Sequence, residues 1–324
     1  MKTIEGVVVV GDVQVLRNLF YPQVIGKNGL PVVRALIAPG GAKSGRTMAE
    51  RFRAFESAGI VADHFDKALA TSSGSYNTVA YCAGQTHITP DVYEKMSWLN
   101  PEVLQSAWTK RDYLGLEYLR AELINMLDLD AFYKNKTDLM IGVADMKANV
   151  KLFNAKDPNI NVFDLMYASS ALFPFVQPVK IAGERYVDGG YTRQSSVLQW
   201  ARKILRDTPL EQEINMLYVA NRPHPLHHQH PWEDWIFNGI VDTFLTPYYP
   251  ELGEGAKSIG DKVAKAADAF GRPHKRGRAC AIFGLKDENI RPNEWRVRTL
   301  RTCGALTHKR TEACLKALKP TIWV

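Results

Sequence analysis

The chain has 324 residues, of which 46% are hydrophobic and 23% are charged. This composition supplies a large buried core, which excludes an intrinsically disordered protein. The net charge of +7 comes without a helix-turn-helix, zinc or RNA-binding signature, so we expect no nucleic-acid partner. Many basic residues fall in 272–278 and 291–301, where they suit either a solvated face or attraction to an anionic lipid surface.

Apolar runs of strand length alternate with amphipathic segments of helical period, which predicts an α/β fold. In such a fold helices flank a mostly parallel central sheet, giving a three-layer sandwich. We expect strands at 33–39, 65–71, 138–145 and 214–220, a further strand at 149–154 and an edge hairpin at 180–190. Helices are expected at 46–59, 73–84, 112–127 and 195–205, and residues 1–30 as an outer strand and a short helix.

The chain contains no internal repeat, low-complexity tract or long linker, so residues 1–324 are predicted to form a single domain. A change of composition at 224–232 suggests that a core over 31–222 is followed by a peripheral section over 223–324. Four cysteines lie far apart, which favours reduced thiols over a disulfide framework. Because no signal peptide or membrane span is evident, a cytoplasmic protein is expected, with peripheral membrane contact and the oligomeric state left open.

The expected strand at 65–71 runs directly into Ser72 and then into a helix. A serine at a sharp strand-to-helix turn exposes its hydroxyl above a helix amino terminus, where negative charge is stabilised. Such a turn needs small residues two positions before and after the serine, and Ala70 and Gly74 meet this need in the pattern A-T-S-S-G. The alternative is a serine that only caps the helix.

A glycine-rich loop follows the strand at 33–39 and contains Gly40, Gly41, Ala42 and Lys43. Its backbone N–H groups can approach an anion closely, so the Gly41 and Ala42 amides are candidates for an oxyanion hole. The same letters, GGAKSGRT, also resemble a phosphate loop with arginine in place of its lysine, which weakens a nucleotide-binding interpretation. A tight turn without a ligand is the third alternative.

Further along, the stretch A-S-S-A at 168–171 precedes Asp188, Gly189 and Gly190. By itself an aspartate before two glycines is a common turn. The four pieces together resemble the patatin-like phospholipase family, whose members carry a glycine-rich oxyanion loop, a G-x-S-x-G serine, an A-S-[ST]-A stretch and a D-G-[GA] motif. The resemblance covers about residues 31–222 and departs from the family pattern at Pro39, at Ser44 beside the shifted Gly45, and at Ala70.

The resemblance implies a serine acyl hydrolase that cleaves carboxylic esters of lipids without a metal or cofactor. Ser72 would be the nucleophile and Asp188 its only general base, and Gly40, Gly41, Ala42 and Lys43 would form the oxyanion loop. Ala70, Gly74, Gly189 and Gly190 would support these motifs. Phospholipid, lysophospholipid and simple ester substrates are all compatible with this assignment, and activity is expected to fall in acid as Asp188 takes up a proton.

Other functions stay open at this point. Ser72, Asp188 and one of His224, His227 or His228 follow the chain order of an α/β-hydrolase triad. The same histidines could bind a metal, although surface histidines are the commoner case. An inactive lipid-binding scaffold would keep the fold and lose turnover.

A last segment bears on lipid contact. An apolar face at helical spacing joins Trp232, Trp235, Ile236, Ile240 and Phe244. It fits a helix packed on the sheet and also an interfacial helix or lid.

Overall fold

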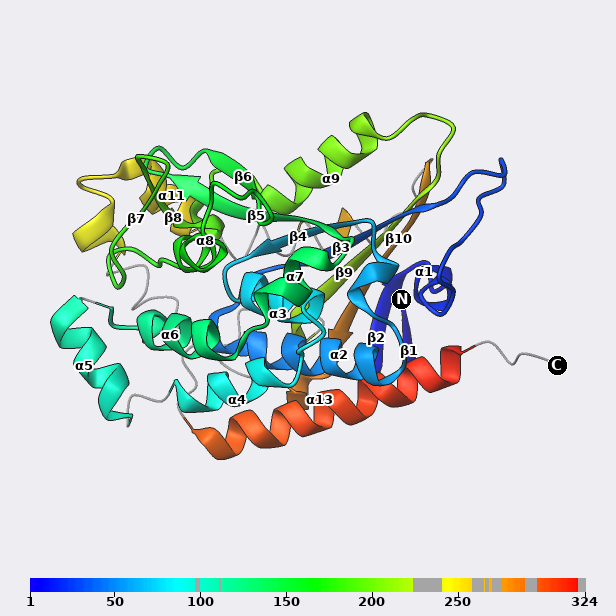
Figure 1. The fold of residues 1–324 in the computed structure, drawn as a ribbon, viewed down its shortest axis with the longest axis horizontal. Coiled ribbons are helices and arrows are strands. Elements are labelled where there is room, and N and C mark those ends of the chain that lie inside the picture. Colours follow the sequence, from blue (N-terminus) through cyan, green and yellow to red (C-terminus); the bar gives the residue numbers. More distant parts are fainter. Residues whose placement is uncertain are drawn as a thin grey trace.

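The computed structural model describes residues 1–96, 100–110, 112–223, 241–257, 265, 268–269, 276–288 and 296–319. Its strands form one mixed sheet in the order β1-β2-β10-β9-β3-β4-β5-β8-β7, with β6 paired to β5 (Figure 1). The strand bounds are β1 Lys2–Ile4, β2 Val7–Gly11, β3 Val33–Ala38, β4 Lys67–Thr71, β5 Asp138–Asp145, β6 Val150–Asn154, β7 Val179–Ile181, β8 Glu184–Asp188, β9 Ile214–Pro223 and β10 Gly277–Gly284.

The centre of the sheet is parallel and its edges are antiparallel. Neighbours in the series β10, β9, β3, β4 and β5 are all parallel, whereas β1, β2, β6, β7 and β8 pair in the antiparallel sense. Parallel strands buried on both faces read as continuous apolar runs, which is why these strands were predictable. The expected α/β class, the central strands and the edge hairpin are confirmed.

Helices cover both faces of the sheet. Figure 1 shows α9 on one face and α2, α3 and α13 on the other. The helices are α1 Gln14–Asn18, α2 Gly45–Ser57, α3 Ser73–Cys82, α4 Ile88–Lys95, α5 Pro101–Lys110, α6 Leu116–Met126, α7 Leu129–Lys134, α8 Val162–Ser169, α9 Ser196–Asp207, α11 Pro250–Lys257 and α13 Val297–Leu318. Short turns of helix are η1 Ala42–Ser44, η2 Ala62–His64, η3 Gly189–Tyr191, η4 Val241–Leu245 and η5 Lys286–Glu288.

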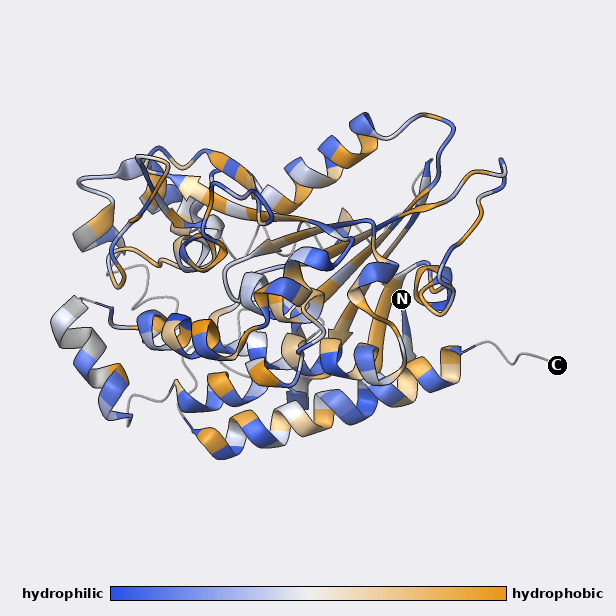
Figure 2. Ribbon diagram, in the orientation of Figure 1, coloured by the Kyte–Doolittle hydropathy of each residue, from blue (hydrophilic) through white to orange (hydrophobic). Residues whose placement is uncertain are grey.

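Alternate side chains of the central strands point to opposite faces of the sheet and pack into two different hydrophobic cores. In β3, Leu36 and Ala38 belong to the core beneath α2 and α3, whereas Ala35 and Ile37 pack with Trp200 of α9. Figure 2 shows the same arrangement in colour, with largely hydrophobic central strands between helices that alternate hydrophobic and hydrophilic residues. The helix α9 therefore buries one face against the sheet, whereas all ten residues of α3 are buried.

The expectations about the two ends of the chain were correct only in part. Residues 1–30 lie at one edge of the sheet and contain the expected short helix, α1, but they supply two strands, and β2 pairs with β10. The sheet also does not end at the composition change near 224–232, because β10 lies between β9 and β2 and Cys280, Ala281 and Phe283 are buried. The section after residue 222 is therefore not wholly peripheral.

Two properties concern the whole described chain. Its four cysteines are buried and free. Among the residues that the structure describes, no helix is both long and apolar enough to cross a membrane.

Candidate active site

Ser72 occupies a strained turn between β4 and α3. Its φ of 50° and ψ of −132° place a non-glycine residue in the left-handed half of backbone space. Backbone of this kind costs on the order of 1–3 kcal/mol and persists where the surrounding structure enforces it. The Ser72 side chain forms no capping hydrogen bond with α3 among the described residues, whereas its carbonyl accepts bonds from the Ser75 N–H and hydroxyl. The helix-cap alternative is therefore disfavoured.

Asp188 ends β8 at the same level of the sheet at which β4 ends. Thr71 lies opposite Gly142 of β5, and the next residue of β5, Val143, lies opposite Asp188. Gly189 continues toward β4, since a Cβ at this position would lie 2.4 Å from the Gly142 carbonyl oxygen and 3.4 Å from Thr71 Cγ2. The aspartate loop is thus packed against the residue that precedes Ser72.

The Asp188 carboxylate is held within its own turn. Asp188 is 3% exposed, and its Oδ1 accepts a hydrogen bond from Gly190 N at 2.7 Å. Tyr191 lies in the same turn and donates its hydroxyl to the Phe173 carbonyl oxygen. Burial, with the charge of Asp188 as a smaller cause, raises the pKa of Tyr191, so this phenol stays neutral at physiological pH.

The A-S-S-A stretch holds both candidate residues. Ser169 Oγ accepts a hydrogen bond from Ser72 N at 2.8 Å and donates one to the Gly142 carbonyl oxygen at 2.7 Å. Two residues later, the Ala171 carbonyl oxygen accepts from Asp188 N at 3.0 Å. The stretch therefore ties the backbones of Ser72 and Asp188 to one short segment at the end of α8.

The glycine loop lies directly against Ser72. A Cβ at Gly40 would approach Ser72 Cβ to 2.5 Å and Ser72 Oγ to 3.2 Å, so a side chain at 40 would crowd the hydroxyl. Gly40 N donates to Thr71 Oγ1 at 3.1 Å. Gly41 and Ala42 open the turn η1, where N–H groups have no partner within the helix. Lys43 is buried in the same loop.

Small residues in the elbow are required by this loop. A Cβ at Gly74 would lie 2.1 Å from the Ala38 carbonyl oxygen and 2.8 Å from that of Pro39. Glycine at 74 therefore lets the end of β3 pass over the start of α3. Ala70 is fully buried and pairs with Ala38, so the methyl group that replaces the usual glycine is accommodated between strands.

The amino termini of two helices meet beside Ser72. Asn77 of α3 donates to the Gly45 carbonyl oxygen at 2.8 Å, and a Cβ at Gly45 would lie 2.8 Å from Ser73 Cβ. Because each helix carries partial positive charge at its amino terminus, α2 and α3 together favour negative charge at this position.

Asn221, at the end of β9, is a site residue that the sequence did not reveal. It is 2% exposed, and its Nδ2 donates to the Gly40 carbonyl oxygen at 2.6 Å and to that of Pro39 at 3.3 Å. A Cβ at Gly41 would lie 2.1 Å from the same nitrogen. No motif marks this asparagine, because its partners are backbone atoms about 180 residues away in the chain.

The phosphate-loop alternative places its cation at Arg46. In the structure this guanidinium is 6% exposed and pairs with Glu50 and Glu94. Because Glu50 and Glu94 already neutralise its charge, this guanidinium does not serve to bind the phosphates of a nucleotide. The arrangement of the loop therefore favours the oxyanion interpretation.

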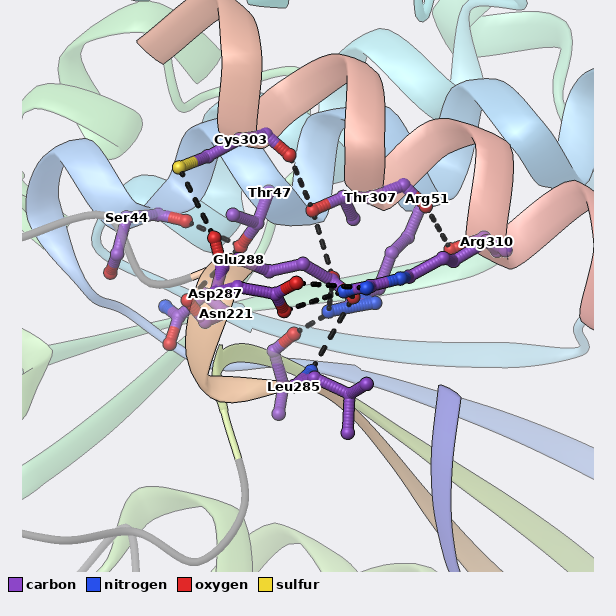
Figure 3. A network of polar contacts seen from close by, with 12 residues as sticks. Ser44, Thr47, Arg51, Asn221, Leu285, Asp287, Glu288, Cys303, Thr307 and Arg310 are labelled. Atoms are coloured by element: carbon purple, nitrogen blue, oxygen red, sulfur yellow. Dashed lines mark hydrogen bonds and ion pairs between the residues drawn. The ribbon is translucent and has the colours of Figure 1, made fainter. Parts of the chain in front are cut away.

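A buried polar network joins α2 and β9 to the carboxy-terminal part of the chain (Figure 3). Arg51 donates to the Ala220 carbonyl oxygen and pairs with Glu288 at 3.2 Å, and both side chains are 1% exposed. Thr307 and Arg310 of α13 bond to the same carboxylate at 2.9 and 3.0 Å. Ala220 precedes Asn221, so the network reaches the strand end that supports the glycine loop.

Several earlier candidates fall outside the described residues. His224, His227 and His228 belong to this group, as do Trp232, Trp235, Ile236 and Ile240, and the side chain of Phe244. The histidine triad, the histidine metal site and the interfacial helix are therefore not tested. Elsewhere in the described chain, no cluster of three or more histidine, cysteine, aspartate or glutamate side chains is arranged to hold a metal ion.

Solved structures that align with this chain share little sequence with it. VipD from Legionella pneumophila aligns at 9% identity and a TM-score of 0.34, over 83% of this chain and 72% of that one. ExoU from Pseudomonas aeruginosa, solved with SpcU, aligns at 14% identity and a TM-score of 0.30, over 82% of this chain and 58% of that one. The chain thus spans less than two thirds of the ExoU length.

A search of curated protein sequences finds no significant match. The family comparison does find one, because residues 37–212, more than half of the 324, match the patatin-like phospholipase family. The matched range includes the glycine loop, Ser72, the A-S-S-A stretch and Asp188. The chain belongs to the patatin-like phospholipase family, a family of hydrolases.

Proposed function

We propose that the chain hydrolyses carboxylic esters of lipids through a Ser72–Asp188 dyad and an acyl-enzyme. The observation that carries the proposal is that the A-S-S-A segment holds both backbones, through Ser169 to Ser72 and through Ala171 to Asp188. The strained backbone of Ser72 and the adjacent glycine loop support the same assignment.

The reaction begins when Ser72 Oγ adds to the ester carbonyl carbon and its proton passes to Asp188. The resulting oxyanion lies at the Gly41 and Ala42 amides, a contribution of about 3 kcal/mol for each donor in comparable sites. Collapse expels the alcohol, which takes the proton from Asp188. Water then attacks the acyl group with Asp188 as base, and Ser72 recovers its proton as the fatty acid leaves.

The proposal is tested with a tagged fluorophosphonate and with short and long p-nitrophenyl esters. Wild type is compared with Ser72→Ala and Asp188→Asn, and with Ser57→Ala as an exposed serine control. Labelling and turnover should disappear in Ser72→Ala, and turnover should fall at least about a thousandfold in Asp188→Asn. A folded wild type that is not labelled would overturn the proposal, and ATP binding would then be measured.

A further inference from the structure

Both carbonyl groups that precede the proposed oxyanion amides are held by side chains. The Gly40 carbonyl oxygen accepts from Asn221 Nδ2 at 2.6 Å. The Gly41 carbonyl oxygen accepts from Ser44, through the backbone N–H at 3.0 Å and through the hydroxyl. In a trans peptide the C=O and N–H bonds point in opposite directions, so each bond fixes the direction of the following amide.

We infer that Asn221 and Ser44 are positioning residues that direct the Gly41 and Ala42 N–H groups toward the oxyanion. The inference rests on the proposed function. The Cα of Gly40 lies next to the Ser72 side chain, and the Gly40 carbonyl oxygen accepts a hydrogen bond from Asn221. The loop therefore lies between these two side chains. The Gly41 N–H, opposite that carbonyl, then points to the side of Ser72.

Both positioning side chains are buried. Ser44 is 0% and Asn221 is 2% exposed, so water does not replace either of them readily. The two hydrogens of Asn221 Nδ2 match its two acceptors, Pro39 and Gly40. A carbonyl that accepts a hydrogen bond also polarises its peptide unit, which makes the N–H on the far side a stronger donor.

Asn221 is in turn held by α2. Thr47 Oγ1 lies 3.0 Å from the Asn221 carbonyl oxygen and 2.8 Å from that of Ser44, so one hydroxyl joins the two positioning residues (Figure 3). Arg51, one turn further along α2, donates to the Ala220 carbonyl oxygen. The backbone that carries Asn221 is therefore fixed by α2, the helix that directly follows the glycine loop.

The test uses Asn221→Ala, Asn221→Asp and Ser44→Ala in the full chain. Asn221→Asp keeps the shape of the side chain and removes its donors. Asn215→Ala is the matched control, because Asn215 lies in the same strand, is buried and has no side-chain hydrogen bond among the described residues. We expect kcat to fall about 10- to 100-fold in the three variants with KM changed less than about threefold, and no change in the control.

A second readout separates positioning from general stability. Ser72 Oγ adds to the carbonyl carbon of an alkyl trifluoromethyl ketone, its proton passes to Asp188 and the ketone oxygen becomes an oxyanion. In each variant, affinity for this ketone should fall by the same factor as kcat. The melting temperatures of the variants should not follow the order of their kcat values.

The outcomes are distinct for the two proposals. If Asn221→Asp and Ser44→Ala keep wild-type kcat and ketone affinity while Ser72→Ala is inactive, the positioning role is overturned and the dyad stands. If Asn221→Ala does not fold, kcat and ketone affinity of Ser44→Ala still test the positioning of the Ala42 N–H. If wild type shows no turnover or labelling that depends on Ser72, the dyad fails and the positioning role fails with it.

Discussion

The hydroxyl of Ser169 connects the turn after β4 to β5, because it accepts a hydrogen bond from Ser72 N and donates one to the Gly142 carbonyl oxygen. Both bonds are buried, and a substitution to alanine leaves two backbone groups without a partner. We expect Ser169→Ala to lower the free energy of unfolding by about 1–3 kcal/mol and to reduce turnover. Urea unfolding and ester hydrolysis measure the two effects, and Ser57→Ala should change neither.

The backbone strain at Ser72 makes a prediction about glycine. Glycine adopts a positive φ without penalty, whereas alanine does not. We expect Ser72→Gly to be more stable than Ser72→Ala by about 1 kcal/mol, although both are inactive. At Arg202, an exposed interior position of α9, the order should be reversed, because glycine costs about 1 kcal/mol more than alanine within a helix. Equal stabilities at position 72 would argue against strain.

Gly41 is expected to accept no side chain. A Cβ there would lie 2.1 Å from Asn221 Nδ2 and 2.4 Å from Ser44 Oγ, closer than van der Waals contact allows. We predict that Gly41→Ala displaces the loop and lowers kcat about 100-fold or more, as the loss of an oxyanion donor does. Gly26→Ala is the control, since its Cβ would first meet flexible side-chain ends of Asn28 and Glu213. Normal turnover in Gly41→Ala would contradict the assigned geometry.

The buried pair between Arg51 and Glu288 should be sensitive to the loss of one partner. Arg51→Met leaves the Glu288 carboxylate with fewer donors in a buried position, and we expect a loss of about 3–5 kcal/mol in unfolding free energy. The double variant Arg51→Met/Glu288→Leu should lose less than the sum of the two single variants. For comparison, Asp207→Asn breaks exposed ion pairs and should cost at most about 1 kcal/mol.

One pair between α13 and α2 should make stability depend on pH. His308 Nδ1 lies 3.2 Å from Glu50 Oε2, and Nε2 lies 3.3 Å from Glu312 Oε1. The hydrogen bond to Glu50 raises the pKa of His308 against the opposing effects of partial burial and of Arg53. Arg46 also forms an ion pair with Glu50. The protonated histidine therefore stabilises the fold fully below the unfolded-state pKa of about 6.5, and this stabilisation is lost as pH rises through the higher folded value.

His308→Gln should remove this dependence. We expect the stability difference between wild type and His308→Gln, measured by urea unfolding, to shrink between about pH 6 and pH 8. His64→Gln serves as the control, because burial lowers the pKa of His64 and its contribution changes with pH in the opposite direction. A difference that is constant across this range would show that the histidine does not titrate as described.

The sequence predicted what depends on local pattern. β5 was predicted with its observed bounds because its residues form one apolar run. Ser72 and Asp188 could be proposed as catalytic residues because their neighbours form motifs. β10 was missed, since GRACAIFG opens with glycine and arginine next to a basic segment. Asn221 and Glu288 were missed for another reason, because their partners are brought close only by the folded chain.

The reactivity of the four buried thiols can be used to measure rates of unfolding. Burial raises the pKa of Cys82 and of Cys314 to about 12, so almost no thiolate is present at neutral pH in the native state. Cys280, in β10, and Cys303, in the first two turns of α13, are buried as well. A disulfide reagent therefore reacts with these sulfurs only when the structure opens, and its progress curve reports the rate at which each region does so.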